Sequence, residues 1–79
     1  MSNSPYGVVL FPSVSHCMRG ESLVQTAGLA CKLIPVPREL SSDCGTALRF
    51  AWEEREKVQA VLEAAGLEYE GILPLPTRP

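Results

Sequence analysis

Hydrophobic residues open the chain as a short continuous run and then change their spacing. Residues 6–11, Tyr-Gly-Val-Val-Leu-Phe, are almost all apolar and are followed by Pro12. A short apolar run rich in β-branched and aromatic residues predicts a buried strand. After the proline the small and apolar positions recur at spacings of three and four residues, at Cys17, Gly20, Val24 and Ala27. Such spacing places them on one face of a helix, which Gly28 is suited to end.

The remainder of the chain repeats strand and helix patterns in a related order. Further strands are predicted over 29–36, 46–52 and 69–73, and a second helix runs from 53 to Gly66 with an apolar stripe at Val58, Val61, Leu62 and Ala65. The predicted order is β-α-β-β-α-β, and each helix ends at an Ala-Gly-Leu sequence, residues 27–29 and 65–67. This order predicts an α+β, ferredoxin-like fold: a four-stranded sheet with two helices on one face. We expect one domain over residues 6–75, with flexible termini at 1–5 and 76–79.

Length and charge limit what such a domain can do. A chain of 79 residues has room for one sheet and one layer of helices, and not for a deep catalytic cavity. A homodimer would enlarge so small a core. The net charge of −2, without a basic cluster, argues against nucleic-acid binding. No apolar run approaches the length of a membrane span, and residues 1–5 have no signal-peptide character, so we expect no membrane association and a cytoplasmic protein.

The three cysteines differ in their surroundings. Cys17 and Cys31 lie on predicted apolar faces, where cysteine behaves as a small hydrophobic residue. Cys44 lies instead in a polar, turn-rich segment, Ser41-Ser42-Asp43-Cys44-Gly45. An odd number of cysteines without an export signal does not predict a disulfide framework, and their spacing matches no common zinc pattern. We therefore predict no metal site and no bound cofactor.

The segment around Cys44 is longer than a β-β turn requires. Ser41, Ser42 and Asp43 favour local turns, and Gly45 permits backbone conformations that other residues avoid. Such a loop can direct backbone N–H groups at an anion and stabilise a thiolate or persulfide. Arg38 and Arg49 flank the loop and would add positive charge, whereas the carboxylate of Asp43 would raise the pKa of the thiol. From these residues alone, Cys44 could be functional or structural.

A longer motif around Cys44 resembles a known family. Residues 33–50, LIPVPRELSSDCGTALRF, resemble the central motif of a small bacterial family of selenium/sulfur carrier-like proteins, formerly a domain of unknown function. Residues 66–72, GLEYEGI, are similar to the family's last strand, and the resemblance covers about residues 6–73. It implies a cytoplasmic carrier whose chalcogen is held on Cys44. Cys17 departs from the alanine usual in the family, and is either a second, resolving thiol or a packed substitute for alanine.

The carrier hypothesis has two competitors. As a carrier, Cys44 would accept selenium or sulfur from a donor such as a cysteine desulfurase and pass it to an acceptor such as a selenophosphate-forming enzyme. The protein would then be a carrier rather than a self-sufficient enzyme. Alternatively, the domain binds a ligand or a regulatory partner and Cys44 is structural. A redox-sensing thiol is a third hypothesis, and it requires another cysteine close enough for a disulfide.

Overall fold

Four strands and two helices follow one another in the predicted order. The computed structural model describes residues 5–37, 40 and 45–75. Its elements are β1 (Tyr6–Leu10), α1 (Val14–Thr26), β2 (Cys31–Pro35), β3 (Thr46–Ala51), the 3-10 turn η1 (Trp52–Glu54), α2 (Arg55–Ala64) and β4 (Gly71–Pro74). The α+β, ferredoxin-like prediction is confirmed. Boundaries move by one or two residues at most ends, and Trp52, predicted at the end of a strand, begins the 3-10 turn that leads into α2.

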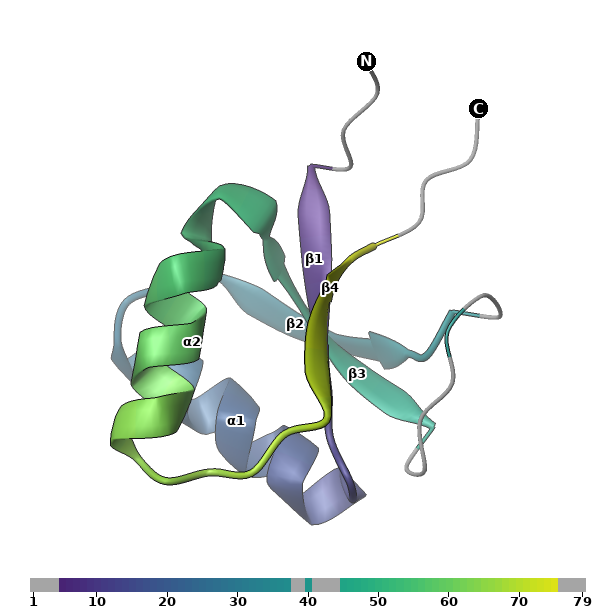
Figure 1. Ribbon diagram of the computed structural model, residues 1–79, viewed down its shortest axis with the longest axis horizontal. Coiled ribbons are helices and arrows are strands. Elements are labelled where there is room, and N and C mark those ends of the chain that lie inside the picture. Colours follow the sequence, from purple (N-terminus) through teal and green to yellow (C-terminus); the bar gives the residue numbers. More distant parts are fainter. Residues whose placement is uncertain (1–4, 38–39, 41–44, 76–79) are drawn as a thin grey trace.

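The strands form one antiparallel sheet in the order β2-β3-β1-β4 (Figure 1). β1 and β3 are therefore central, and β2 and β4 are the two edges. Beyond the strands proper, the Val36 N–H donates to the Gly45 carbonyl (3.1 Å) and the Leu75 N–H donates to the Tyr6 carbonyl (2.9 Å). These bonds extend the β2–β3 and β1–β4 pairings by one residue each.

Both helices end in the same motif, which explains the repeated Ala-Gly-Leu sequence. Gly28 and Gly66 adopt left-handed φ values of 85° and 69°. At the end of α1 the Leu29 N–H donates to the Val24 carbonyl, and at the end of α2 the Leu67 N–H donates to the Leu62 carbonyl. This six-to-one hydrogen bond across a left-handed glycine is the Schellman motif. The glycines therefore stop both helices where the sequence predicted.

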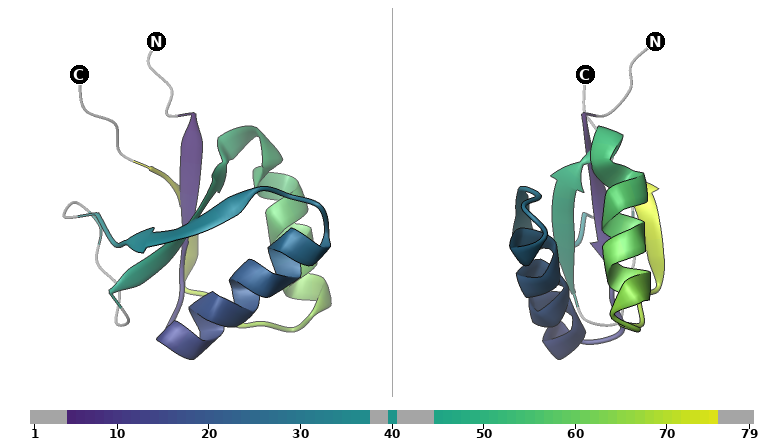
Figure 2. Two further views of the ribbon diagram at one scale, coloured as in Figure 1. Left: turned by 180° about the vertical axis from the view of Figure 1, so that it is seen from behind. Right: turned by 90° about the vertical axis from the view of Figure 1, so that its left-hand side faces the viewer.

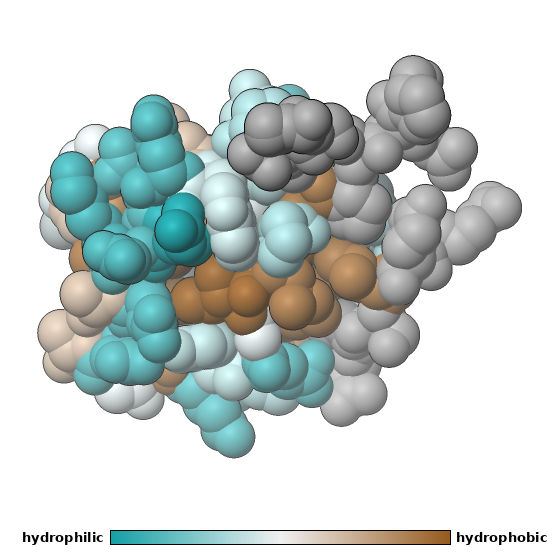
Figure 3. Space-filling view, turned by 45° about the horizontal axis from the view of Figure 1, so that its top comes forward, coloured by the Kyte–Doolittle hydropathy of each residue, from teal (hydrophilic) through white to brown (hydrophobic). Residues whose placement is uncertain are grey.

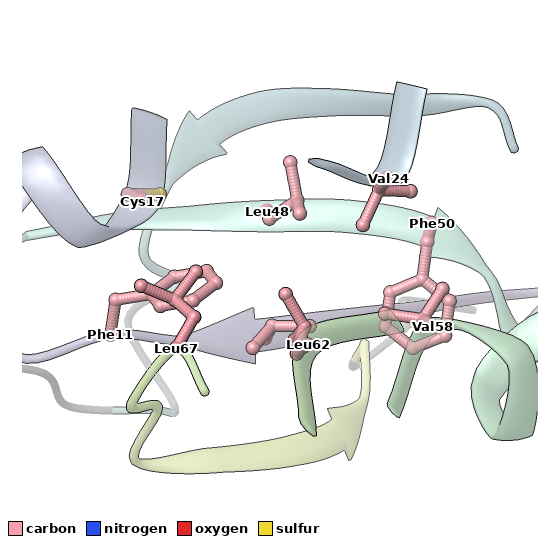
Figure 4. Packing of buried hydrophobic residues seen from close by; sticks show 9 residues of the cluster. Phe11, Cys17, Val24, Leu48, Phe50, Val58, Leu62 and Leu67 are labelled. Carbon is pink, nitrogen blue, oxygen red and sulfur yellow. The ribbon is translucent and has the colours of Figure 1, made fainter. Parts of the chain in front are cut away.

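The main core lies between the helices and one face of the sheet (Figures 2 and 4). Strand residues of one parity point toward the helices, and both helices contribute their apolar stripes. The buried members are Val9, Phe11, Cys17, Val24, Leu48, Phe50, Val58, Leu62 and Leu67. Burial of this apolar surface is the main favourable contribution to folding in a chain of this size.

Gly20 allows α1 to approach the sheet closely. A Cβ atom at this position would lie 2.6 Å from the ring of Phe11, which is fully buried. The close approach requires a residue without a side chain, and Gly20 lies on the helix face that the sequence pattern predicted to be the inner one. Glycine lowers helix stability by about 1 kcal/mol relative to alanine, and the packing of the Phe11 ring against the helix offsets that cost.

The opposite face of the sheet carries a second, smaller cluster. Val8, Leu10 and Ala47 are buried there, with Ile34, Val36, Leu40, Leu73 and Leu75 packed against them. Neither α1 nor α2 covers this face (Figure 2). We call this side of the sheet, which α1 and α2 leave uncovered, the open face. In the view of Figure 3, a band of hydrophobic residues reaches the surface in the centre and is bordered by polar residues.

Candidate functional site

The predicted reactive segment lies largely outside the described residues. Arg38 and the run Ser41-Ser42-Asp43-Cys44 are among the positions that the structure does not describe. Gly45 is described: it is exposed and adopts a left-handed φ of 73°. An L-residue with a side chain would be strained by about 1 kcal/mol or more in that conformation. Gly45 therefore adopts a backbone conformation that other residues avoid, as the sequence predicted.

The β2–β3 connection begins and ends at a hydrogen-bonded pair. Because the Val36 N–H donates to the Gly45 carbonyl, residues 37–44 span from one side of this pair to the other. Leu40, within that span, is partly buried and packs against the open-face cluster, and its N–H donates to the Pro37 carbonyl at 3.0 Å. One apolar side chain of the motif is thus attached to the open face of the sheet.

Arg49 lies within β3, away from Gly45. Its guanidinium carbon is 4.4 Å from the centre of the Tyr6 ring, a cation–π contact on the open face. Four residues of extended strand separate Arg49 from Gly45, which corresponds to about 13 Å. In the β2–β3 register Arg49 stands directly opposite Lys32. The structure therefore places Arg49 beside Tyr6 and Lys32 rather than beside Gly45.

The other two thiols face the helix-covered side of the sheet. Cys17 is fully buried in the main core (Figure 4). Cys31 is partly buried at the edge of the same core, and its Sγ donates to the Glu21 carbonyl at 3.7 Å. Burial, and secondarily the negative charge of Glu21, raise the pKa of the Cys31 thiol above its ordinary value. Because the thiolate is the nucleophilic form, neither environment favours reaction.

A hollow beside Trp52 was not predicted from the sequence. It has a volume of about 410 Å³ and lies between α2 and β4, where its lining includes Trp52, Arg55, Gln59 and Tyr69. Arg55 stacks on the Trp52 ring, with 4.9 Å between the guanidinium carbon and the ring centre. Tyr69 donates a hydrogen bond to Glu63 (3.0 Å), and its pKa is raised by burial and by this carboxylate. The sequence signal that could have indicated this hollow is the presence of two aromatic residues, Trp52 and Tyr69, at the ends of predicted elements.

The described residues form neither a metal-binding cluster nor a membrane-spanning helix. Among residues 5–37, 40 and 45–75, no group of three or more His, Cys, Asp or Glu side chains is arranged to hold a metal ion. Over the same ranges, neither helix is long and apolar enough to cross a membrane.

Comparison with known proteins places the chain in a family. Neither the curated proteins nor the solved structures yielded a match. The family described as "Putative Se/S carrier protein-like" matches the chain over residues 6–74, which includes all four strands and both helices. The matched range also contains residues 33–50 and 66–72, the two segments that carry the resemblance. The chain therefore belongs to the family of selenium/sulfur carrier-like proteins.

Proposed function

We propose that this protein carries selenium or sulfur covalently on Cys44 and transfers it from a donor enzyme to an acceptor. Membership of the carrier-like family over residues 6–74 is the observation that carries this proposal. The protein would work in the cytoplasm, where cellular reductants keep thiols free. A cysteine desulfurase would suit as donor, and a selenophosphate-forming enzyme would suit as acceptor of selenium.

The environments of the other two cysteines support Cys44 as the carrier. Cys17 has no exposed surface, so a donor enzyme cannot reach it in the folded protein. Cys31 has a raised pKa and a thiol hydrogen bond to a backbone carbonyl, both of which keep it protonated. Of the three thiols in the chain, Cys44 is the one that the sequence places among polar residues rather than on an apolar face. Transfer chemistry on Cys44 would leave the core intact.

The proposed transfer is a pair of thiolate exchanges without net oxidation. The Cys44 thiolate attacks the outer sulfur of a donor persulfide, forming a bond between the two sulfurs while the donor thiolate leaves with the electron pair of the broken bond. The outer sulfur, now on Cys44, is next attacked by an acceptor nucleophile, and the Cys44 thiolate leaves. Selenium in place of the outer sulfur follows the same steps. Such exchange is fastest for an attacking thiol whose pKa lies near the ambient pH.

Mass spectrometry of the intact protein tests the proposal. After incubation with a cysteine desulfurase and cysteine, we expect the wild-type protein to gain the mass of one sulfur atom, and digestion to locate it on Cys44. Cys44→Ser should gain none. Cys31→Ser and Cys17→Ala are matched controls that remove the other thiols and should load like the wild type. Loading of Cys44→Ser to the wild-type extent would contradict the proposal, and absence of loading in every variant would favour a ligand-binding or regulatory module.

A further inference from the structure

A second hollow lies on the open face, at the end of the sheet where β2 begins and β3 ends. Its volume is about 320 Å³, and its lining includes Tyr6, Ala30, Lys32, Arg49 and Ala51. Tyr6, Lys32, Arg49 and Ala51 share one parity along their strands, that of Val8 and Ala47 on the open face, and Ala30 directly precedes β2. Cys31 and Phe50, of the opposite parity, complete the lining. The alanines leave space between the larger side chains. We call this feature the Lys32–Arg49 hollow.

Two positive charges meet at this hollow without a described counterion. Lys32 and Arg49 are directly opposite each other in the antiparallel register of β2 and β3. Like charges in directly opposite positions destabilise a sheet. Within residues 5–37, 40 and 45–75 the ion pair found joins Lys57 and Glu54, on α2 and η1, and no described carboxylate pairs with Lys32 or Arg49. In a protein of net charge −2, this local excess of positive charge is a site where an anion would be stabilised.

The guanidinium of Arg49 is oriented by its contact with the Tyr6 ring. It lies over the Tyr6 ring at 4.4 Å, and Tyr6 is 41% exposed at the surface. A cation–π contact uses the flat face of a guanidinium and leaves its N–H edge available for a planar anion. A carboxylate accepts two parallel hydrogen bonds from such an edge. Lys32, which is exposed on the neighbouring strand, can supply a second positive charge to the same anion.

We propose that the Lys32–Arg49 hollow binds a small organic anion through its carboxylate group. The carboxylate lies between the two cationic side chains, and an apolar body lies over Ala30 and Ala51, beside the Tyr6 ring that Arg49 covers. Small-ligand sites combine an apolar lining with a few polar groups in this way, and their volumes begin at about 300 Å³. The site uses neither Cys44 nor the Ser41–Gly45 segment, so this proposal can be tested independently of the carrier function.

Titration with benzoate, followed by backbone amide NMR at constant ionic strength, tests this site. In the wild type we expect saturable shifts concentrated at Tyr6, Lys32, Arg49 and Ala51. The double variant Lys32→Gln/Arg49→Gln should bind at least about tenfold more weakly, because charge-assisted hydrogen bonds are lost. The matched control is Arg55→Gln/Lys57→Gln. This control removes the same amount of positive charge and also a stack between an arginine and an aromatic ring, that of Arg55 on Trp52. We expect it to bind benzoate as tightly as the wild type does.

Benzyl alcohol tests whether binding at the hollow requires the carboxylate or only the apolar ring of the ligand. It has a similar ring without the carboxylate, and we expect no saturable shifts at the hollow. Benzoate binding that is equal in both double variants, or shifts that spread over the surface without saturating, would overturn the proposal. Saturable binding of benzyl alcohol at the same residues would also overturn it, because the two cations would then play no part in recognition.

Discussion

The two faces of the sheet bury apolar surface to very different extents. Among the described residues, the helix-covered face contributes to a core of nine buried residues, drawn from two strands, both helices, Phe11 after β1 and Leu67 after α2. On the open face the described buried residues are Val8, Leu10 and Ala47, and the side chains packed on them are only partly buried. The open face also carries Lys32 and Arg49 and receives Leu40 from the motif segment. One face thus provides most of the buried apolar surface, and the other leaves apolar and charged side chains partly accessible to solvent.

The largest expected effect compares one leucine from each face. Leu48→Ala, on the helix-covered face, removes a fully buried side chain and should lower the free energy of unfolding by about 2–5 kcal/mol. Leu73→Ala removes the same atoms from the open face, where the side chain is only partly buried, and should cost clearly less. Urea unfolding of both variants measures the difference. Equal losses would show that the open face is as much a core as the helix-covered face.

A smaller effect concerns pH and the thiol of Cys31. Its folded-state pKa is raised above the ordinary 9.0, so in alkaline solution the unfolded chain releases this proton first. The stability that this thiol contributes should therefore be full below pH 9.0 and fall as the pH rises above it, by well under the limit of about 1.4 kcal/mol per pH unit for one group, because the site is only partly buried and solvent screens it. Cys31→Ser keeps a donor for the Glu21 carbonyl and removes the titration. Unfolding curves for the wild type and this variant between pH 9.0 and the ordinary tyrosine value of 10.0 should diverge, and parallel curves would contradict the assignment.

The smallest expected effect comes from the charges of the open face. Lys32→Glu replaces a like-charged pair with an opposite pair across β2 and β3, and should raise the free energy of unfolding by about 0.2–1 kcal/mol. The gain should shrink in high salt, because exposed charges are screened. Lys57→Glu is the control with the same charge change, and it should not stabilise because it breaks the pair with Glu54. A loss of stability in Lys32→Glu would show that Lys32 is not opposed by Arg49 in solution.

Local signals explain why the order of elements was predictable. Pro12, Gly28 and Gly66 end elements through backbone geometry that depends on a few neighbouring residues. The helical spacing that placed Cys17 on an inner face is also local, and Cys17 is indeed fully buried. Trp52 was misplaced because its parity continues that of Leu48 and Phe50. Its ring does stack on Phe50, with 6.1 Å between the ring centres, although its backbone has already left the strand.

The candidate sites depend on contacts that sequence patterns do not contain. Arg49 meets Tyr6 and Lys32 only through the pairing of β3 with β1 on one side and with β2 on the other. That register is a long-range property that the sequence pattern does not contain, and the charge that Arg49 would add beside Cys44 stays a prediction. The assignment of Cys44 itself rests on its polar neighbours and on the family motif, since its position lies outside the described residues.

The two edge strands also limit how this protein can meet other chains. Adjacent residues of a strand direct their backbone groups to opposite sides. Because Val36 and Leu75 bond inward, to β3 and β1, the preceding positions Pro35 and Pro74 face the free edges. Proline has no N–H to offer an incoming strand, and natural proteins use it at sheet edges against aggregation. An incoming strand would therefore find no N–H donor at the Pro35 end of β2 or at the Pro74 end of β4, which weakens strand addition at these two positions.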